Sequence, residues 1–402
     1  MKVLQLCYKP PYPALDGGMM GMHNVTRGLL AAGEEVWVLT VESDKHPLHR
    51  ANLSKEYVRT THLQAVKIDL VPHAFPAAVA LLTGESYNVK RYENAAFQQC
   101  LVKTLQETDF DTVLFESVFL SPYVATVRKH SHARVVLHAP NVEHRIWRDA
   151  ALQCKSPLKR WYMKHLALSL RAYECEMARR YDAVVCVSKR DAAFFQEQGQ
   201  KHILVKPYGV CLDEAPKPAF PNQEEGEELS LYHLGSMDWQ ANVQSVEWFL
   251  GDVWPRIRAT VPQARLYLAG RKMSDEMKSR KIEGVTMVGE VDDAAAFVAD
   301  KQINVVPLLY GSGIRVKIIE AMTAGKTVIS TAIGAEGIEY TDGKNILIAN
   351  TAEDFVRLIA RCADDGAYCR RIAQGGRMLV EERYDNAKLT RQLINFILPA
   401  AQ

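Results

Sequence analysis

Short apolar runs alternate with amphipathic stretches along most of the chain. Residues 3–6 form a first apolar run, residues 24–32 show the period of a helix that Gly33 ends, and residues 35–41 form a second apolar run. This order predicts a strand, a helix and a second strand. Further strands are predicted at 65–71, 112–116, 134–138 and 183–187, with helices at 94–107, 121–129 and 157–180. Such alternation is typical of a parallel sheet that helices cover on both faces.

The pattern breaks between residues 210 and 229, where three prolines precede a run of glutamates. This composition predicts a linker or a surface loop between two domains. The alternation then restarts, with strands at 229–234, 264–269, 285–288, 303–307, 327–331 and 346–348 and helices at 243–257, 294–299, 314–324 and 352–363. The chain therefore predicts two α/β domains, each with a doubly wound parallel sheet.

The composition fits a soluble enzyme or binding protein and narrows its class. A chain of 402 residues is long enough for two domains, and its net charge of +2 gives no overall field that favours nucleic acid. The eight cysteines are scattered without a Cys-x-x-Cys pair, which is typical of reduced thiols in a cytoplasm. Residues 1–7 suit a first strand better than a signal peptide, and no apolar run approaches the roughly 20 residues that span a bilayer. We therefore expect a cytoplasmic location.

Ligands of open α/β sheets bind beyond the carboxyl ends of the strands. In this chain, that rule directs attention to the loops at 10–21, 138–144, 235–242, 289–293 and 308–313. These five loops are where we expect the functional residues.

The loop and helix at residues 310–322 have the features of an anion site. Ser312 is a predicted N-cap, and Gly325 is predicted to end the helix. Arg315 and Lys317 then fall in the first turn, where the helix macrodipole disfavours a cation by about 0.3–1 kcal/mol. An anion bound to the free backbone N–H groups would explain this placement, because both side chains would contact it as well. The alternative is that both are solvated surface charges.

Several motifs match a known family in order along the chain. In the second half they are Gly235-Ser236-Met237-Asp238-Trp239, Gly289-Glu290-Val291-Asp292-Asp293, the stretch from Gly311 to Thr331, and Gly334-Ala335-Glu336-Gly337. In the first half they are Asp16-Gly17-Gly18 and Asn141-Val142-Glu143-His144. With these motifs the chain resembles the retaining glycosyltransferases of family four, also called glycosyl transferases group 1. The resemblance covers nearly the whole chain and implies the GT-B fold, in which two Rossmann-like domains face a cleft.

The resemblance implies a donor site for a nucleotide-diphosphate sugar. Arg315 and Lys317 would neutralise the pyrophosphate during catalysis, and Glu320 would bind the ribose. The other residues implied for donor binding are Gly17, Gly18, Gly235, Ser236, Gly289, Val291, Ser312, Gly313 and Ile314. No metal and no cofactor besides the nucleotide sugar would be needed, because two cations and a helix N-terminus can stabilise the leaving diphosphate.

The resemblance also implies a different binding role for each domain. Residues 1–210 would bind a glycan or glycolipid acceptor, residues 211–385 would bind the nucleotide sugar, and a helix at 386–398 would pack back on the first domain. His138, where a predicted strand ends, is a candidate catalytic contact. The residues implied for acceptor binding are Asp16, Asn141, Glu143 and His144.

Two positions depart from the family pattern. Ser312 stands where the family often has the first glutamate of a Glu-x7-Glu pair, and Pro140 stands where related proteins often have a histidine. A retaining transfer needs no enzyme base when the leaving phosphate takes the acceptor proton. We therefore predict a retaining glycosyltransferase of surface polysaccharide or glycoconjugate biosynthesis. A sugar-nucleotide epimerase of the same fold and a catalytically degenerate nucleotide-sugar-binding protein stay open as alternatives.

Three other patterns have a less specific meaning. Asp16-x-Gly18-x-x-Gly21 is one glycine short of a dinucleotide fingerprint, and prolines lengthen its loop, which argues against a nicotinamide enzyme. Asp292 or Asp293 is predicted to cap the helix at 294–299. Residues 155–180 interleave basic and aromatic side chains, which suits either a solvated helix face or peripheral contact with the anionic inner face of a membrane. In the second case the acceptor could be lipid-linked.

Overall fold

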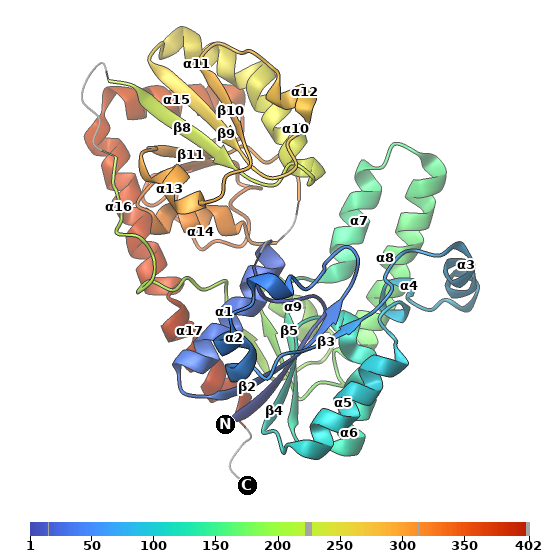
Figure 1. Cartoon of the computed structure of the whole chain (residues 1–402). Helices are drawn as coiled ribbons and strands as arrows, with labels where there is room; N and C mark the ends of the chain where they lie inside the picture. Colours follow the sequence, from blue (N-terminus) through green and yellow to red (C-terminus); the bar gives the residue numbers. More distant parts are fainter. Residues whose placement is uncertain (15, 222–226, 312, 399–402) are drawn as a thin grey trace. The chain divides into compact units, whose positions relative to one another are not determined.

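The computed structural model describes residues 1–14, 16–221, 227–311 and 313–398, and the chain forms two compact units (Figure 1). Unit 1 consists of Met1–Gly209 and Asn386–Gln402, and unit 2 consists of Val210–Asp385. Unit 2 is therefore inserted into unit 1, ahead of helix α17 (Asn386–Ile397). None of the described helices combines the length and the apolar character that crossing a bilayer requires.

The sheet of unit 1 has seven described strands, all parallel, in the order β3-β2-β1-β4-β5-β6-β7. Their bounds are β1 Lys2–Cys7, β2 Glu35–Glu42, β3 Gln64–Lys67, β4 Thr112–Phe115, β5 Arg134–Ala139, β6 Ala183–Cys186 and β7 Ile203–Val205. Val113 and Phe115 of β4 lie in one apolar cluster, whereas Leu114 lies in another. Both faces of the sheet are thus buried, which is why its central strands are continuous apolar runs.

Helices cover both faces of this sheet. Their bounds are α1 Gly17–Ala31, α2 Lys55–Thr60, α3 Ala74–Thr83, α4 Tyr87–Lys90, α5 Ala95–Glu107, α6 Val124–His130, α7 Glu143–Gln153, α8 Pro157–Met177 and α9 Lys189–Glu197, with 3-10 turns at Arg50–Asn52 and Val118–Tyr123. Leu29 of α1 and Leu393 of α17 pack on the face of Leu114, and Phe97 of α5 packs on the face of Val113 and Phe115.

The sheet of unit 2 has six described strands, all parallel, in the order β10-β9-β8-β11-β12-β13. The strands are β8 Leu229–Leu234, β9 Ala264–Ala269, β10 Val285–Gly289, β11 Ile303–Val306, β12 Thr327–Ser330 and β13 Leu347–Ile348. The helices are α10 Gln240–Trp248, α11 Trp254–Thr260, α12 Asp275–Lys278, α13 Ala294–Ala299, α14 Val316–Thr323, α15 Ala352–Asp364 and α16 Gly366–Arg383, with a π-helical turn at Phe249–Val253 between α10 and α11. The predicted fold class, two doubly wound α/β units, is confirmed.

Helix α1 begins at Gly17, so the prediction of a helix from residue 24 was wrong at this end. The carboxylate of Asp16 caps the helix by accepting a hydrogen bond of 2.9 Å from the backbone N–H of Met19. Gly17, Gly18 and Gly21 are poor helix formers, and they made this turn look like loop in the sequence. A good N-cap and burial against the sheet outweigh that low propensity.

Helix α16 was not predicted, because Gly375 and Gly376 interrupt its apolar pattern. A side chain at Gly375 would collide with the carbonyl oxygen of Lys344, and a Cβ at Gly376 would lie 3.0 Å from Cγ of Met322 on α14. The two glycines therefore let α16 approach its neighbours closely. Helices α7 and α9 were also missed, and the helix predicted at 243–257 is divided by the π-helical turn.

Candidate functional site

Helix α14 begins at Val316, with Arg315 as its N-cap, so the prediction of Ser312 as N-cap was wrong. Ser312 itself lies outside the described residues. The side chain of Arg315, the N-cap, makes no capping hydrogen bond to α14. The N-cap residue therefore provides no side-chain acceptor for the first N–H groups of the helix. Lys317 is the second residue of the helix. The predicted end of the helix is confirmed, because Gly325 follows the C-cap with a φ of 72°.

The ammonium group of Lys317 is held by neutral side chains. Its Nζ lies 3.0 Å from Oδ1 of Asn242 and 3.4 Å from Nε2 of His233. Nδ1 of His233 lies 2.8 Å from the carbonyl oxygen of Val305 and donates to it, which leaves Nε2 as an acceptor for the ammonium. Burial and the Lys317 charge lower the pKa of His233 to about 3, so the imidazole is neutral.

Withdrawal from water also acts on Lys317. Together with the nearby positive charge of Arg315, and against the opposing charge of Glu320, it lowers the pKa of the ammonium to about 7. The structure therefore places Arg315 and Glu320 close enough to Lys317 to act on its charge. Two cations held together in this way favour a bound anion, which would return the ammonium to its charged form.

Arg315 is almost fully buried and packs on an aromatic ring. Its Nη1 donates a hydrogen bond of 2.6 Å to the carbonyl oxygen of Gly313, and its guanidinium carbon lies 5.1 Å from the ring centroid of Trp239. Burial lowers the pKa of Arg315 to about 10, so the group still carries its charge at neutral pH. The indole of Trp239 thus fixes the direction of the cation.

Glycine backbone borders the two cations. A Cβ at Gly235 would collide with Nζ of Lys317 and would lie 2.9 Å from Nδ2 of Asn242. Gly311, with a φ of 127°, would place a Cβ 2.7 Å from Nη2 of Arg315. The carbonyl oxygen of Ser236 accepts a hydrogen bond of 2.8 Å from Nδ2 of Asn242, so one amide ties the loop after β8 to Lys317. The structure thus brings Gly235, Ser236, Gly313, Arg315 and Lys317 together.

Gly289, Val291 and Ile314 are the other donor residues predicted in the loops of unit 2. Gly289 ends β10 with a φ of 80°, and its carbonyl oxygen accepts a hydrogen bond of 2.7 Å from the N–H of Gly270. Val291 follows it in the next loop. Ile314 packs close to Gly337, where an added Cβ would lie 2.9 Å from Cγ1 of Ile314. Asp293 caps α13 through two backbone N–H groups, as predicted.

In unit 1 the end of β1 and the start of α1 form a second polar group. Nζ of Lys9 lies 2.7 Å from Oδ2 of Asp16, the helix cap. Burial opposes ionisation of Asp16, but the charge and hydrogen bonds of Lys9 outweigh it and lower the pKa of the carboxyl. A Cβ at Gly18 would lie 2.9 Å from Oη of Tyr8 and 3.0 Å from Nζ of Lys9. Asp16, predicted for acceptor binding, therefore already serves a cap and an ion pair; Gly17 is the first residue of α1.

His138 lies in a buried chain of hydrogen bonds that the sequence did not reveal. Its Nδ1 is 2.6 Å from Oε2 of Glu116, which is fully buried just beyond β4. Oε1 of Glu116 accepts a hydrogen bond of 2.6 Å from Nε2 of Gln5, and Oε1 of Gln5 accepts one of 2.7 Å from Thr26. The one signal in the sequence was a glutamate directly after a buried strand. Glu116 fixes the orientation of the His138 ring through Nδ1, and Nε2 is the ring nitrogen that does not face Glu116.

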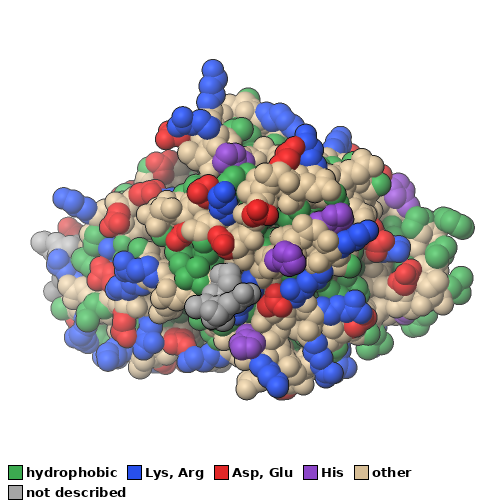
Figure 2. Space-filling view, turned by 90° about the horizontal axis from the view of Figure 1, so that it is seen from below, with side chains coloured by type: hydrophobic (Ala, Val, Ile, Leu, Met, Phe, Trp, Pro, Cys, Tyr) green, Lys and Arg blue, Asp and Glu red, His purple; other side chains and the backbone are tan. Residues whose placement is uncertain are grey.

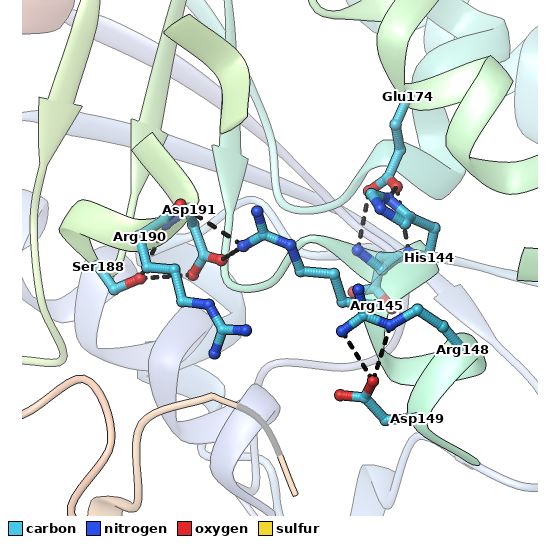
Figure 3. A network of polar contacts seen from close by, with 9 residues as sticks. His144, Arg145, Arg148, Asp149, Glu174, Ser188, Arg190 and Asp191 are labelled. Atoms are coloured by element: carbon cyan, nitrogen blue, oxygen red, sulfur yellow. Dashed lines mark hydrogen bonds and ion pairs between the residues drawn. The ribbon is translucent and has the colours of Figure 1, made fainter. Parts of the chain in front are cut away.

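The start of α7 is organised by Glu174 of α8 (Figure 3). Its carboxylate accepts hydrogen bonds from the backbone N–H groups of Glu143 at 2.8 Å and His144 at 3.1 Å, and it lies 2.6 Å from Nδ1 of His144. Burial and the charge of Glu174 together raise the pKa of Glu143 to about 8, against the effect of a hydrogen bond with Asn141. Glu143 is therefore mostly protonated at neutral pH.

A neighbouring pair completes this network. Nη1 of Arg145 lies 3.2 Å from Oδ1 of Asp191, and Oγ of Ser188 donates a hydrogen bond of 2.7 Å to Oδ2 of the same carboxylate (Figure 3). The charges of Glu143, Asp16 and Glu116 all act on the hydroxyl of Tyr8, whose pKa burial raises and these charges raise further. Asp16, Glu116 and Glu143 therefore all lie near the Tyr8 hydroxyl. Nowhere in the described part of the chain do three or more His, Cys, Asp or Glu side chains gather closely enough to hold a metal ion.

Comparisons with known proteins agree with this architecture. Residues 228–365 match the family model "Glycosyl transferases group 1". A relative from Klebsiella pneumoniae, described as an uncharacterized 44.6 kDa protein in the cps region, is 22% identical over 411 residues, with 96% of this chain and 97% of the relative covered.

Two solved structures have similar folds. Alr3699/HepE from Anabaena, in complex with UDP, has a TM-score of 0.66 and 14% identity, with 98% of this chain and 99% of that one covered. WaaG, a glycosyltransferase involved in lipopolysaccharide biosynthesis, has a TM-score of 0.65 and 16% identity, with coverage of 99% and 100%. Residues 228–365 are therefore similar to the glycosyl transferases group 1 family, and the chain has the GT-B fold of these two structures.

Proposed function

We propose that the chain is a retaining glycosyltransferase that moves a sugar from a nucleotide-diphosphate sugar to a glycan or glycolipid acceptor. Unit 2 binds the donor, and unit 1 binds the acceptor. The observation that supports this most directly is the pair of cations at the start of α14, where Lys317 has neutral hydrogen-bond partners and a pKa of about 7. A diphosphate supplies the negative charge that this pair lacks.

The proposed chemistry follows from the placement of these charges. The bond between the anomeric carbon and the diphosphate oxygen breaks, and the acceptor hydroxyl forms the new bond on the same face of the sugar. Its proton passes to the oxygen of the leaving diphosphate. Arg315, Lys317 and the N–H groups of α14 stabilise the charge that develops there, so we propose that no metal and no further cofactor is needed.

His138 is the proposed contact between unit 1 and the reacting groups. Glu116 holds its Nδ1 at 2.6 Å, which fixes the ring and the tautomer. Asn141, Glu143 and His144 follow β5 in the same unit, and we propose that the acceptor binds beside them. Because Glu143 has a pKa of about 8, it can donate a hydrogen bond to an acceptor oxygen at neutral pH.

The comparisons suggest which ligands to test first. HepE binds UDP and also UDP-glucose, so a uridine diphosphate sugar is the proposed donor class. The Klebsiella relative lies in a cps region, and WaaG acts in lipopolysaccharide biosynthesis, which supports an acceptor from surface polysaccharide assembly. All eight cysteines are free thiols, which supports a cytoplasmic site of action.

Calorimetry with UDP tests the donor site. We expect the double variant Arg315→Ala with Lys317→Ala to lose detectable binding, because it removes both charges that face the diphosphate. Lys281→Met, which removes an exposed lysine of the same unit, is the matched control and should bind UDP as the native protein does. Native affinity in the double variant would remove the anion site from this helix start.

Turnover separates the proposed transferase from its alternatives. The native protein is incubated with UDP-glucose, alone and with a pool of surface glycans, and the products are followed by NMR. We expect a new glycosidic product only when the acceptor pool is present, with the anomeric configuration retained. Isomerised sugar from donor alone would indicate an epimerase, and binding without any turnover would indicate a degenerate binding protein.

A further inference from the structure

Helix α3 presents an apolar stripe to solvent. Phe75, Val79 and Leu82 are 80%, 41% and 87% exposed, and their spacing places them on one face of the helix. The opposite face holds the helix on unit 1, because Ala77 and Ala80 pack in a cluster with Leu166 of α8. An amphipathic helix normally buries its apolar side, whereas α3 is apolar on both sides and buries only one.

The neighbouring helix α8 also exposes apolar side chains along its first half and middle. Leu158, Trp161 and Leu168 are 77%, 56% and 65% exposed at helical spacing. Figure 1 shows α3 beside α4 and α8 at one edge of unit 1, and Figure 2 shows hydrophobic side chains gathered at the same edge. We call the exposed faces of α3 and the first half of α8 the α3–α8 surface. Six large exposed apolar side chains on two neighbouring helices are more than the isolated exposed residues of an ordinary globular protein.

The charge on this surface is mostly positive, although Asp69 and Glu85 flank α3 and pair with His73 and Lys90. Residues 150–173 contain five Lys and Arg residues and no Asp or Glu, in a chain that has 47 acidic residues in all. Residues 70–84, which include α3, contain no acidic residue either. The basic side chains of the first segment are all exposed: Lys155, Lys159, Arg160, Lys164 and Arg171.

We propose that the α3–α8 surface binds the face of an anionic lipid bilayer. The apolar side chains enter the boundary between headgroups and acyl chains, where Trp161 suits the interface, and the basic side chains contact anionic headgroups. A protein partner or a second copy of the chain would explain the apolar stripe, but an apolar protein interface does not require a rim in which basic residues outnumber acidic ones. The charge complementarity therefore favours lipid. This proposal needs no nucleotide sugar, so it goes beyond the proposed reaction.

Vesicle flotation of the full chain tests the proposal. One set of vesicles contains phosphatidylcholine alone, and the other contains phosphatidylcholine with phosphatidylglycerol. We expect the protein to float with the anionic vesicles, to stay behind with the neutral ones, and to be released at high salt. Flotation with neither set, or equal flotation with both, would overturn the proposal.

Two double variants divide the contributions to this binding. Phe75→Ser with Leu82→Ser removes the apolar stripe, and Lys159→Gln with Arg160→Gln removes part of the positive rim. We expect each to reduce the bound fraction on anionic vesicles at least about tenfold, because apolar insertion and charge attraction act together. The changed side chains are exposed, so stability to heat should stay native.

Matched controls remove side chains of the same kind elsewhere. Met378→Ser removes an apolar side chain that is 67% exposed on α16, and Lys129→Gln removes an exposed lysine of α6. Both should float as the native protein does, and all variants should keep the native affinity for UDP. Sedimentation without vesicles gives the last outcome. A dimer that the Phe75→Ser and Leu82→Ser variant dissociates would show that the surface serves self-association, and would overturn the proposal.

Discussion

The polar groups of unit 1 and unit 2 handle charge in opposite ways. In unit 1 the buried side chains His138 and His144 each meet a buried carboxylate, at 2.6 Å in both cases. In unit 2 the ammonium of Lys317 meets an amide oxygen and a neutral imidazole instead. These two histidines of unit 1 are therefore satisfied by the protein's own residues, and unit 2 has positive charge that a ligand can neutralise. Removing a buried carboxylate from unit 1 should cost stability, and removing a cation from unit 2 should cost ligand binding.

Glu174→Ala should give the largest effect on stability. It removes a carboxylate that is 1% exposed and that binds two backbone N–H groups and His144. We expect the free energy of unfolding to fall by about 3 kcal/mol, because the two backbone N–H groups and the His144 ring would stay buried without their hydrogen-bond acceptor. Chemical denaturation measures this change, and UDP affinity, measured on the folded variant, should stay native. A variant of native stability would contradict the idea that unit 1 is held by its own charges.

Glu116→Gln should give the largest effect on turnover. The amide keeps the shape of the side chain but loses the charge that orients His138, so we expect kcat to fall by about 10- to 100-fold. The KM for the donor should change little, because Glu116 belongs to unit 1. His138→Ala should lower kcat similarly, and the double variant should be no slower than the slower single one. Losses that multiply in the double variant would show that the two residues act separately.

The pH dependence of UDP binding should reveal the ammonium of Lys317. With a pKa of about 7 in the free protein, Lys317 must take up a proton when the diphosphate binds above neutral pH. We expect affinity to fall by up to about tenfold per pH unit as the pH rises above 7, until the pKa of the bound state is reached. Calorimetry in buffers of different ionisation enthalpy measures the proton uptake. Lys317→Met should bind UDP more weakly and take up fewer protons than the native protein above pH 7; uptake equal to the native value would exclude Lys317 as the source.

Lys317→Met should have the smallest effect on stability. Because the pKa of Lys317 is lower in the folded chain than the ordinary value, the unfolded chain binds a proton more readily between pH 7 and pH ~10. This group therefore lowers stability at neutral pH, and its contribution becomes more favourable as the pH rises through that window. Without ligand we expect the variant to be as stable as the native protein, or more stable by at most about 1 kcal/mol. Thermal denaturation without UDP measures this, and a clear loss would show that Lys317 supports the fold.

The sequence was informative where a single element carried the pattern. Continuous apolar runs predicted the buried strands, and the segment from Gly311 to Glu320 identified the cations of α14, because all these residues are neighbours in the chain. Two ion pairs could not be predicted, His138 with Glu116 and His144 with Glu174. Each joins side chains from different elements, and their spacing in the sequence gives no sign of the contact. His233 was missed for the same reason, since its contact with Lys317 crosses from β8 to α14. The start of α14 was placed too early, because Ser312 has the chemistry of a cap but the helix begins after Arg315.

The insertion of unit 2 into unit 1 sets an order for synthesis on the ribosome. Leu393 and Ile397 of α17 belong to the same buried cluster as Val3 and Leu29, which are made first. The carbonyl oxygen of Ile397 also accepts a hydrogen bond from Thr112 of β4. The part of this face that α17 covers thus stays exposed until every residue of unit 2 has been translated. The nascent chain has to keep that part from aggregating until α17 emerges from the ribosome.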